Sequence, residues 1–193
     1  MKIICIGDSL TTGFGVFKEN RWTEILVRDY KLDIVNKGLN GDTTSGMLCR
    51  FYEDVIALKP SHVNIMGGCN DLLSNRRLTN IIGNVEEMVK DSVSAGIKPV
   101  LCTEAPVIED LAKRKWSWDS DYKYVIESTL EYRNWILSYC YTNNLPCIDF
   151  HKLFMDELTC RKASELYIDG LHPSEYGHRI MAEEASKIFS NFS

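Results

Sequence analysis

The chain of 193 residues is long enough to bury a substantial core, and we expect one domain over residues 1–193. Hydrophobic residues make up 45% of the chain and charged residues 25%, a balance that is typical of soluble globular proteins and excludes intrinsic disorder. The 22 Lys and Arg are outnumbered by 27 Asp and Glu without any basic block, so the net charge of −5 disfavours a nucleic-acid partner.

Five short apolar runs rich in β-branched residues predict β-strands that are buried on both faces. They cover residues 2–6, 33–36, 62–66, 98–103 and 146–149. The intervening segments carry apolar residues at helical spacing and predict helices over residues 22–30, 47–56, 81–89, 122–141 and 180–189. This alternation implies right-handed crossovers, so the predicted fold class is α/β with a five-stranded parallel sheet covered on both sides.

The segment over residues 105–121 departs from this alternation. It is long for a connection in a compact domain, and such connections often act as lids or binding loops. Its two tryptophans, Trp116 and Trp118, would then line a pocket. Alternatively, the segment is an irregular helix that packs the tryptophans on the core. The sequence leaves both interpretations open.

Small and polar residues follow the predicted strands. In open parallel sheets ligands bind beyond the carboxyl ends of the strands, so these segments are the place to look for a functional site. They comprise residues 7–13, 38–43, 67–71 and 104–106, together with residues 169–173 before the last predicted helix. The concentration of such residues at one edge of the sheet predicts the site there.

Ser9 is the candidate nucleophile because it directly follows the first buried strand. A neutral hydroxyl needs an adjacent base, and His172 is the best candidate among the four histidines. Pro173 disfavours helical geometry at His172, which places it in a loop, and the following helix N-terminus favours the neutral imidazole. Asp169 precedes it closely and is expected to accept from the other ring nitrogen, as the third member of a triad does.

An oxyanion formed at such a site needs hydrogen-bond donors. Gly41 lies in a glycine-rich turn, where a bare backbone N–H can approach a substrate closely. Asn70 offers a side-chain amide after the third predicted strand. With the backbone N–H of Ser9, these groups predict an oxyanion hole of three donors. Asp8 and Asp71 are expected to be structural, as are His62, His151 and His178.

These residues resemble the motifs of the GDSL, or SGNH, hydrolase family along the whole chain. Gly7-Asp8-Ser9-Leu10 is similar to the first motif of the family, and Gly41 corresponds to the glycine of the second. Gly68-Cys69-Asn70-Asp71 is similar to the third motif, and Asp169-Gly170-Leu171-His172 to the fifth. A single motif of this kind is weak evidence, whereas four in the family's order are strong. No Gly-x-Ser-x-Gly occurs, which argues against the ordinary α/β-hydrolase scaffold.

The resemblance implies a flavodoxin-like three-layer α/β/α fold and ester hydrolysis through an acyl-enzyme on Ser9. It implies that Ser9, His172 and Asp169 are catalytic, and that Ser9, Gly41 and Asn70 form the oxyanion hole. No metal or organic cofactor is expected. Members of the family hydrolyse lysophospholipids, thioesters, aryl esters and acetylated sugars, so a small ester is the expected partner, with short acyl chains favoured. Loops near residues 75–79 and 105–121 are expected to shape its pocket.

The sequence is also compatible with two other function classes. The segment Thr11-Thr12-Gly13-Phe14-Gly15 follows the first strand, where flavodoxin-like proteins bind a flavin phosphate. A flavin carrier would not need the Asp-x-x-His motif near the C-terminus, which therefore favours the hydrolase. The other alternative is a catalytically idle binding protein on the same fold.

The sequence also suggests a compartment. The apolar run at the N-terminus ends at Asp8 and is too short for a signal peptide, and no stretch has the length of a membrane span. Seven cysteines are present without a Cys-x-x-Cys pair, so neither a disulfide framework nor a structural zinc site is expected. A reduced, cytoplasmic protein is the simplest prediction.

Overall fold

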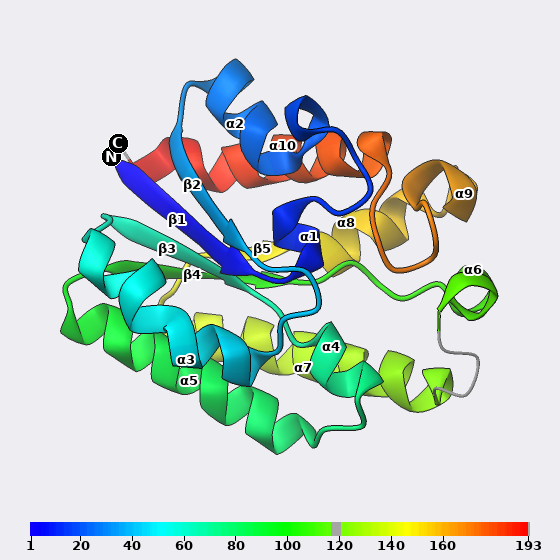
Figure 1. Cartoon of the computed structure of the whole chain (residues 1–193), viewed down its shortest axis with the longest axis horizontal. Helices are drawn as coiled ribbons and strands as arrows, with labels where there is room; N and C mark the ends of the chain where they lie inside the picture. Colours follow the sequence, from blue (N-terminus) through cyan, green and yellow to red (C-terminus); the bar gives the residue numbers. More distant parts are fainter. Residues whose placement is uncertain (117–120, 193) are drawn as a thin grey trace.

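The computed structural model describes residues 1–116 and 121–192 and is built around a five-stranded parallel sheet (Figure 1). The strands are β1 (Lys2–Gly7), β2 (Asp33–Gly38), β3 (His62–Met66), β4 (Lys98–Thr103) and β5 (Cys147–Asp149). Their order across the sheet is β2-β1-β3-β4-β5, and every pair is parallel. The predicted fold class is thus confirmed.

Helices cover both faces of the sheet (Figure 1). They are α1 (Ser9–Thr12), α2 (Trp22–Tyr30), α3 (Thr44–Asp54), α4 (Cys69–Leu73), α5 (Leu78–Ser94), α6 (Glu109–Lys115), α7 (Tyr122–Asn143), α8 (Phe150–Glu157), α9 (Ala163–Leu166) and α10 (Glu175–Phe189). Short 3₁₀ turns occur at Lys18–Asn20, Ile56–Leu58 and Ser190–Phe192. Helices α3, α5 and α7 lie on one face, and α2, α8 and α10 lie on the other (Figure 1). No helix in the described part of the chain is both long and apolar enough to span a membrane.

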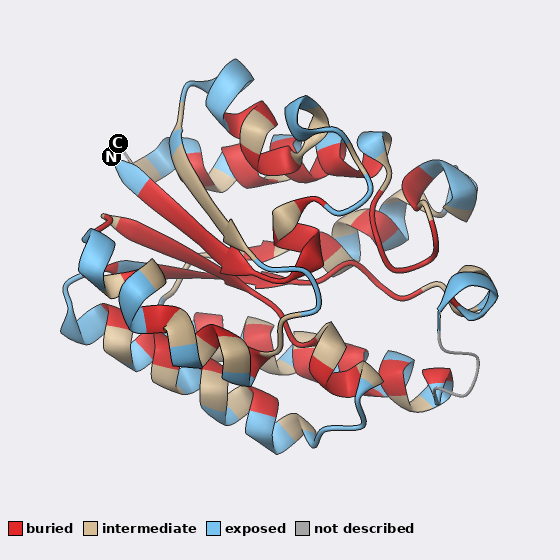
Figure 2. Cartoon of the chain, in the orientation of Figure 1, coloured by how far each residue is buried: buried red, intermediate tan, exposed pale blue. Residues whose placement is uncertain are grey.

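The two faces of the sheet bury two separate hydrophobic cores because side chains alternate along each strand. In β1, Ile4 and Ile6 join the core under α3, α5 and α7, whereas Ile3 and Cys5 join the core under α2, α8 and α10. Burial on both faces is confirmed for the inner strands (Figure 2). It is wrong for β2 and β5, whose residues are mostly half-buried because these strands form the two edges of the sheet.

The predicted strand and helix boundaries need small corrections. β3 and β4 run over the predicted residues, whereas β5 starts one residue later than expected, at Cys147. Pro146 has no N–H to donate, and it contributes only its carbonyl, which accepts from Leu101 N at 3.2 Å. α3 stops at Asp54, short of the predicted end, and the chain continues in the 3₁₀ turn Ile56–Leu58.

The strand order creates the crevice that a site needs. After β1 the chain passes to β2 on one side, and after β2 it returns to β3 on the other side of β1. The loops that follow β1 and β3 therefore diverge at the carboxyl edge of the sheet, which is where open α/β sheets bind ligands. Ser9 follows β1 and Asn70 follows β3, so both lie at this switch point.

Candidate active site

Ser9 is the first residue of α1, directly beyond the carboxyl end of β1. Asp8 caps this short helix, because its Oδ1 accepts from Leu10 N at 2.9 Å. The strand must end in a glycine here, since a Cβ on Gly7 would collide with the Thr11 side chain and the Met66 carbonyl. Ser9 itself is only 6% exposed, and it lines a pocket at this edge of the sheet.

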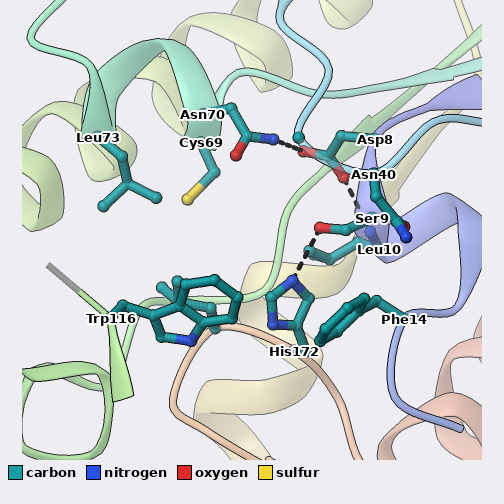
Figure 3. Close-up of a pocket in the computed structure, with 12 residues that line it drawn as sticks. Asp8, Ser9, Leu10, Phe14, Asn40, Cys69, Asn70, Leu73, Trp116 and His172 are labelled. Carbon is teal, nitrogen blue, oxygen red and sulfur yellow. Dashed lines mark hydrogen bonds between the residues drawn. The ribbon is translucent and has the colours of Figure 1, made fainter. Parts of the chain in front are cut away.

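His172 lies within hydrogen-bonding distance of Ser9 although 163 positions separate them in the chain. Its Nε2 is 2.9 Å from Ser9 Oγ, and its Nδ1 is 2.8 Å from Asp169 Oδ2. Figure 3 shows the imidazole and the hydroxyl directed at each other. The fold thus brings together the three residues that the sequence predicted for a nucleophile, its base and the group that orients the base.

Asp169 remains a carboxylate in this buried position. Burial by itself raises its pKa, but hydrogen bonds from the His172 ring and from the backbone N–H groups of His172 and Leu171 outweigh it. The two N–H groups donate to Oδ1 at 2.8 and 2.9 Å. The net pKa is about 2. An ionised Asp169 accepts from Nδ1, which leaves Nε2 of a neutral His172 free to accept a proton from Ser9.

The loop that carries His172 is held by backbone contacts on both sides. Ile108 N donates to the Gly170 carbonyl at 2.8 Å, and Ile168 N donates to the His172 carbonyl at 3.0 Å. Gly170 has a φ of +89°, and a Cβ there would come within 2.6 Å of the Ile108 carbonyl, so only glycine fits against the start of α6. This packing couples the loop to the segment over residues 105–116.

Two aromatic rings contact the His172 imidazole (Figure 3). The ring centroids of Phe14 and Trp116 lie 4.5 and 5.3 Å from that of His172. Trp116 is the C-cap of α6, so the segment over residues 105–116 contains a helix and also lines the pocket with its tryptophan. The helix of one interpretation and the pocket-lining tryptophan of the other thus occur together, whereas Trp116 is 40% exposed and does not pack on the core. Trp118 lies outside the described residues.

The backbone N–H groups of Ser9 and Gly41 are available to a ligand. Gly41 has a φ of +75° in the exposed turn after β2, and a Cβ at this position would meet no atom within 4 Å. Among the described residues, neither N–H donates to a protein acceptor. Both residues line the same pocket, as the predicted oxyanion hole requires.

Asn70 lines this pocket too, but its amide protons are already engaged. Nδ2 donates to Asp8 Oδ2 at 3.0 Å and to the Asp42 carbonyl at 2.9 Å. Figure 3 shows the amide nitrogen turned toward Asp8. The structure therefore places Asn70 beside Ser9, where the sequence predicts it, with its amide N–H groups directed at Asp8 and Asp42.

The pocket in front of Ser9 is small and largely apolar, with a volume of about 310 Å³. Its apolar wall consists of Leu10, Phe14, Cys69, Leu73, Trp116 and Leu171. The predicted contribution of residues 75–79 is wrong, because Leu73 in α4 lines the pocket and the following turn does not. The chain leaves α4 there and is already in α5 from Leu78 onward.

The threonine segment after β1 does not form a phosphate site. Thr11 is completely buried, and the Thr12 hydroxyl donates to the Asp8 carbonyl at 2.9 Å. Phe14 packs on His172. These side chains serve the Ser9 helix, so the geometry favours the serine site over the flavin alternative.

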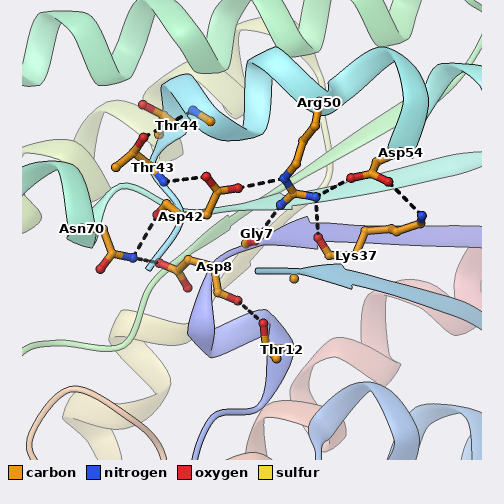
Figure 4. A network of polar contacts seen from close by, with 12 residues as sticks. Gly7, Asp8, Thr12, Lys37, Asp42, Thr43, Thr44, Arg50, Asp54 and Asn70 are labelled. Atoms are coloured by element: carbon orange, nitrogen blue, oxygen red, sulfur yellow. Dashed lines mark hydrogen bonds and ion pairs between the residues drawn. The ribbon is translucent and has the colours of Figure 1, made fainter. Parts of the chain in front are cut away.

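Two titratable residues behind the pocket were not singled out from the sequence. Arg50 in α3 donates to the carbonyls of Gly7 and Lys37 and to the carboxylate of Asp42, which lies next to Gly41 (Figure 4). Glu104 is buried and accepts from Cys69 N at 2.7 Å. Glu104 lies in the segment 104–106 that directly follows a predicted strand, but the sequence assigned it no role, and nothing in the sequence marks Arg50.

The comparisons with known proteins agree with this arrangement. The model of the GDSL-like lipase/acylhydrolase family matches residues 5–180 of the chain. The uncharacterized lipoprotein YqeF of Bacillus subtilis (strain 168) is 29% identical over 94% of this chain and 86% of its own length. An acetylxylan esterase of Geobacillus stearothermophilus is 26% identical over 77% of this chain and 68% of its own length.

The fold has close structural relatives as well. A solved structure from Desulfitobacterium hafniense DCB-2, assigned to the lipolytic G-D-S-L family, superposes with a TM-score of 0.82 at 29% identity. The match covers 97% of this chain and 98% of that one. The five-stranded parallel sheet with helices on both sides is therefore the architecture that these proteins share.

Proposed function

Because the chain belongs to the GDSL-like lipase/acylhydrolase family and is a hydrolase of carboxylic esters, we propose that Ser9 attacks the ester carbonyl with His172 as its base. The observation that carries this proposal is the 2.9 Å contact between Ser9 Oγ and His172 Nε2, with Asp169 on the opposite ring nitrogen. A hydroxyl, an imidazole and a carboxylate in this order are the parts that serine-dependent acyl transfer needs.

The reaction runs in two steps. His172 Nε2 takes the Ser9 proton as Oγ bonds to the carbonyl carbon, and the resulting imidazolium then protonates the leaving alcohol. Water next attacks the acyl-Ser9 ester, gives its proton to His172 and releases the acid as the Ser9 oxygen recovers that proton. Asp169 stabilises the imidazolium in both steps without accepting its proton.

The oxyanion of each tetrahedral intermediate is held by hydrogen-bond donors at the pocket wall. The N–H groups of Ser9 and Gly41 are available for this role. Asn70 adds a third donor by sharing the N–H that it otherwise directs at the Asp42 carbonyl. Donors that are held in place before the reaction stabilise the developing charge without reorganising.

The substrates are esters of short acyl groups. A cavity of about 310 Å³ that also contains the reacting atoms has room for an acetyl or similar acyl group beside its apolar wall. The acetylxylan esterase among the relatives supports an acetylated carbohydrate as the alcohol side of the substrate. Activity on p-nitrophenyl acetate should accordingly exceed that on the decanoate.

The first test replaces the two reacting side chains. Ser9→Ala and His172→Ala should each lower kcat for p-nitrophenyl acetate by roughly 10⁶-fold, because nucleophile and base act as a unit. A fluorophosphonate probe should label the wild type at Ser9 and leave Ser9→Ala unlabelled. Ser94→Ala, at an exposed helix position, is the matched control. Turnover by Ser9→Ala near the wild-type rate would refute the assignment.

A further inference from the structure

Glu104 is a buried acid at the carboxyl end of β4, behind the proposed oxyanion hole. It is 5% exposed, and its Oε2 accepts from Cys69 N at 2.7 Å. Its Oε1 is also buried and accepts from no donor among the described residues, and its side chain lies within hydrogen-bonding reach of the carboxyl group of Asp8. Among the described residues Glu104 forms no ion pair, so no cation balances a negative charge on it.

A hydrogen bond between two carboxyl groups requires that one of them carry the proton. Asp8 accepts from Leu10 N at 2.9 Å and from Asn70 Nδ2 at 3.0 Å, and both donors favour its ionised form. Glu104 accepts from one N–H only. Burial raises the pKa of both acids, and the charge of Asp8 raises that of Glu104 further, well above its usual range. The proton therefore resides on Glu104.

Building on the function proposed for Ser9 and Asn70, we propose that Glu104 is a positioning residue: a carboxylic acid that stays protonated at neutral pH and donates to Asp8. Its proton remains on Glu104 and is not transferred to the substrate. Through Asp8 it acts on the helix that begins at Ser9, and through Cys69 N it acts on the residue before Asn70. One acid thus ties the end of β4 to the two loops that carry the nucleophile and the amide donor.

In the described part of the chain, the surroundings of Glu104 offer no compensating cation. The titratable or charged groups that face Glu104 or Asp8 are Cys69 and Asp71 from α4, Tyr132 and Arg133 from α7, Asp42 from the turn after β2, and His172. Arg133 is paired with Asp149 at 2.6 Å, and Tyr132 donates to the Gly67 carbonyl at 3.1 Å. Ionisation of Glu104 at alkaline pH would therefore place two buried negative charges side by side and push the two loops apart.

Infrared spectroscopy tests the protonation state without any reference to catalysis. The wild type at pH 7 should show the C=O stretching band of a protonated carboxylic acid, and Glu104→Gln should lose it. Asp71→Asn is the matched control, because Asp71 is an equally buried acid that instead accepts from the N–H and hydroxyl of Thr44. Absence of the band in the wild type, or its loss in Asp71→Asn rather than Glu104→Gln, would overturn the proposal.

Kinetics test the positioning role. Glu104→Ala should lower kcat by about 10²-fold with little change in KM, because a small displacement of reacting groups has this effect while substrate contacts remain. Glu104→Gln should restore most of kcat, since its amide donates to Asp8 and its carbonyl accepts from Cys69 N. In the wild type, kcat should decline at alkaline pH as Glu104 ionises. Glu104→Gln should not show this decline.

The outcomes separate this proposal from the proposed function. Wild-type kcat in Glu104→Ala, or an unchanged alkaline limb in Glu104→Gln, would overturn the positioning role while Ser9 labelling stays intact. If Glu104→Ala does not fold, the infrared band and the dependence of kcat on pH in Glu104→Gln still test the positioning role. An unreactive Ser9 would instead defeat the hydrolase mechanism and leave the infrared result unaffected.

Discussion

At the scale of single residues, Asp169 shows how hydrogen bonds set the charge of a buried group. Its folded pKa of about 2 lies below the ordinary value of 3.8, so the folded protein binds fewer protons than the unfolded chain as pH falls between these values. The carboxylate therefore stabilises the fold above about pH 4, and this contribution is lost as pH falls toward 2.

Asp169→Asn tests this contribution. At pH 7 the substitution should lower the free energy of unfolding by no more than about 2 kcal/mol, since solvent screening reduces the value implied by the pKa shift. The difference from the wild type should shrink as pH approaches 2. Urea unfolding at several pH values measures it. A difference that is constant from pH 7 to pH 2 would mean that the charge of Asp169 is not its source.

Leu73 shows how a single side chain limits the size of the pocket. It lies on the wall together with Cys69 and Trp116 (Figure 3). Leu73→Ala should make room for a longer acyl chain and raise the ratio of kcat/KM for butyrate over acetate esters by roughly 10-fold, the effect of one or two buried methylene groups. The ratio is measured with p-nitrophenyl esters. Leu58→Ala, remote from the pocket, is the control and should leave it unchanged.

At the scale of elements, Arg50 joins α3 to the ends of two strands and to the turn that carries Gly41 (Figure 4). Its side chain is 17% exposed and pairs with Asp42 at 2.8 Å and Asp54 at 2.7 Å. Because the guanidinium donates to several acceptors in fixed directions, it holds these elements in one relative position.

Arg50→Met should lower the free energy of unfolding by roughly 2–3 kcal/mol, because it leaves partly buried acceptors without a donor. It should also reduce kcat, since the turn with Gly41 loses its support. Arg50→Lys should lower stability and kcat by intermediate amounts, because it keeps the positive charge but loses the planar guanidinium with its several donors. Arg28→Met, which removes an exposed pair with Asp29, is the matched control. Equal stability of Arg50→Met and the wild type in urea unfolding would contradict this account.

At the scale of the whole molecule, the packing of α2 against α10 makes stability sensitive to acid. His178 in α10 is completely buried, with its Nδ1 at 3.4 Å from Trp22 N. Burial, aided by the charge of Arg21, lowers the pKa of His178 to about 3. In the unfolded chain His178 binds a proton near pH 6.5, whereas in the folded protein it stays neutral down to about pH 3. The free energy of unfolding therefore falls as pH drops from 6.5 toward 3.

His178→Gln should remove this dependence. Between pH 6.5 and 4.5 the wild type should lose about 2–3 kcal/mol of unfolding free energy through this group, and the variant should lose correspondingly less. Urea unfolding at the two pH values measures the difference. His151→Gln, at a partly exposed position, should retain most of the wild-type dependence. The same change in unfolding free energy between the two pH values in His178→Gln and in the wild type would refute the role of His178.

Much of this molecule follows from its amino-acid sequence. Alternation of apolar runs and helical spacing determined the α/β class, and the motif residues determined that Ser9, His172 and Asp169 would be neighbours. The first signal is local, because the side-chain period within a strand or helix is set by the backbone geometry of that element alone. The second rests on the resemblance of the motif residues to those of a known family.

Tertiary structure decided the rest. The engagement of the Asn70 amide, the carboxyl pair of Glu104 with Asp8, the contacts of Arg50 and the pocket of about 310 Å³ all join segments that are distant in the chain. β2 is half-buried for the same reason, since its place at the edge of the sheet depends on strand order. Such properties depend on which surfaces meet when the two layers of helices close on the sheet, and no local pattern encodes that.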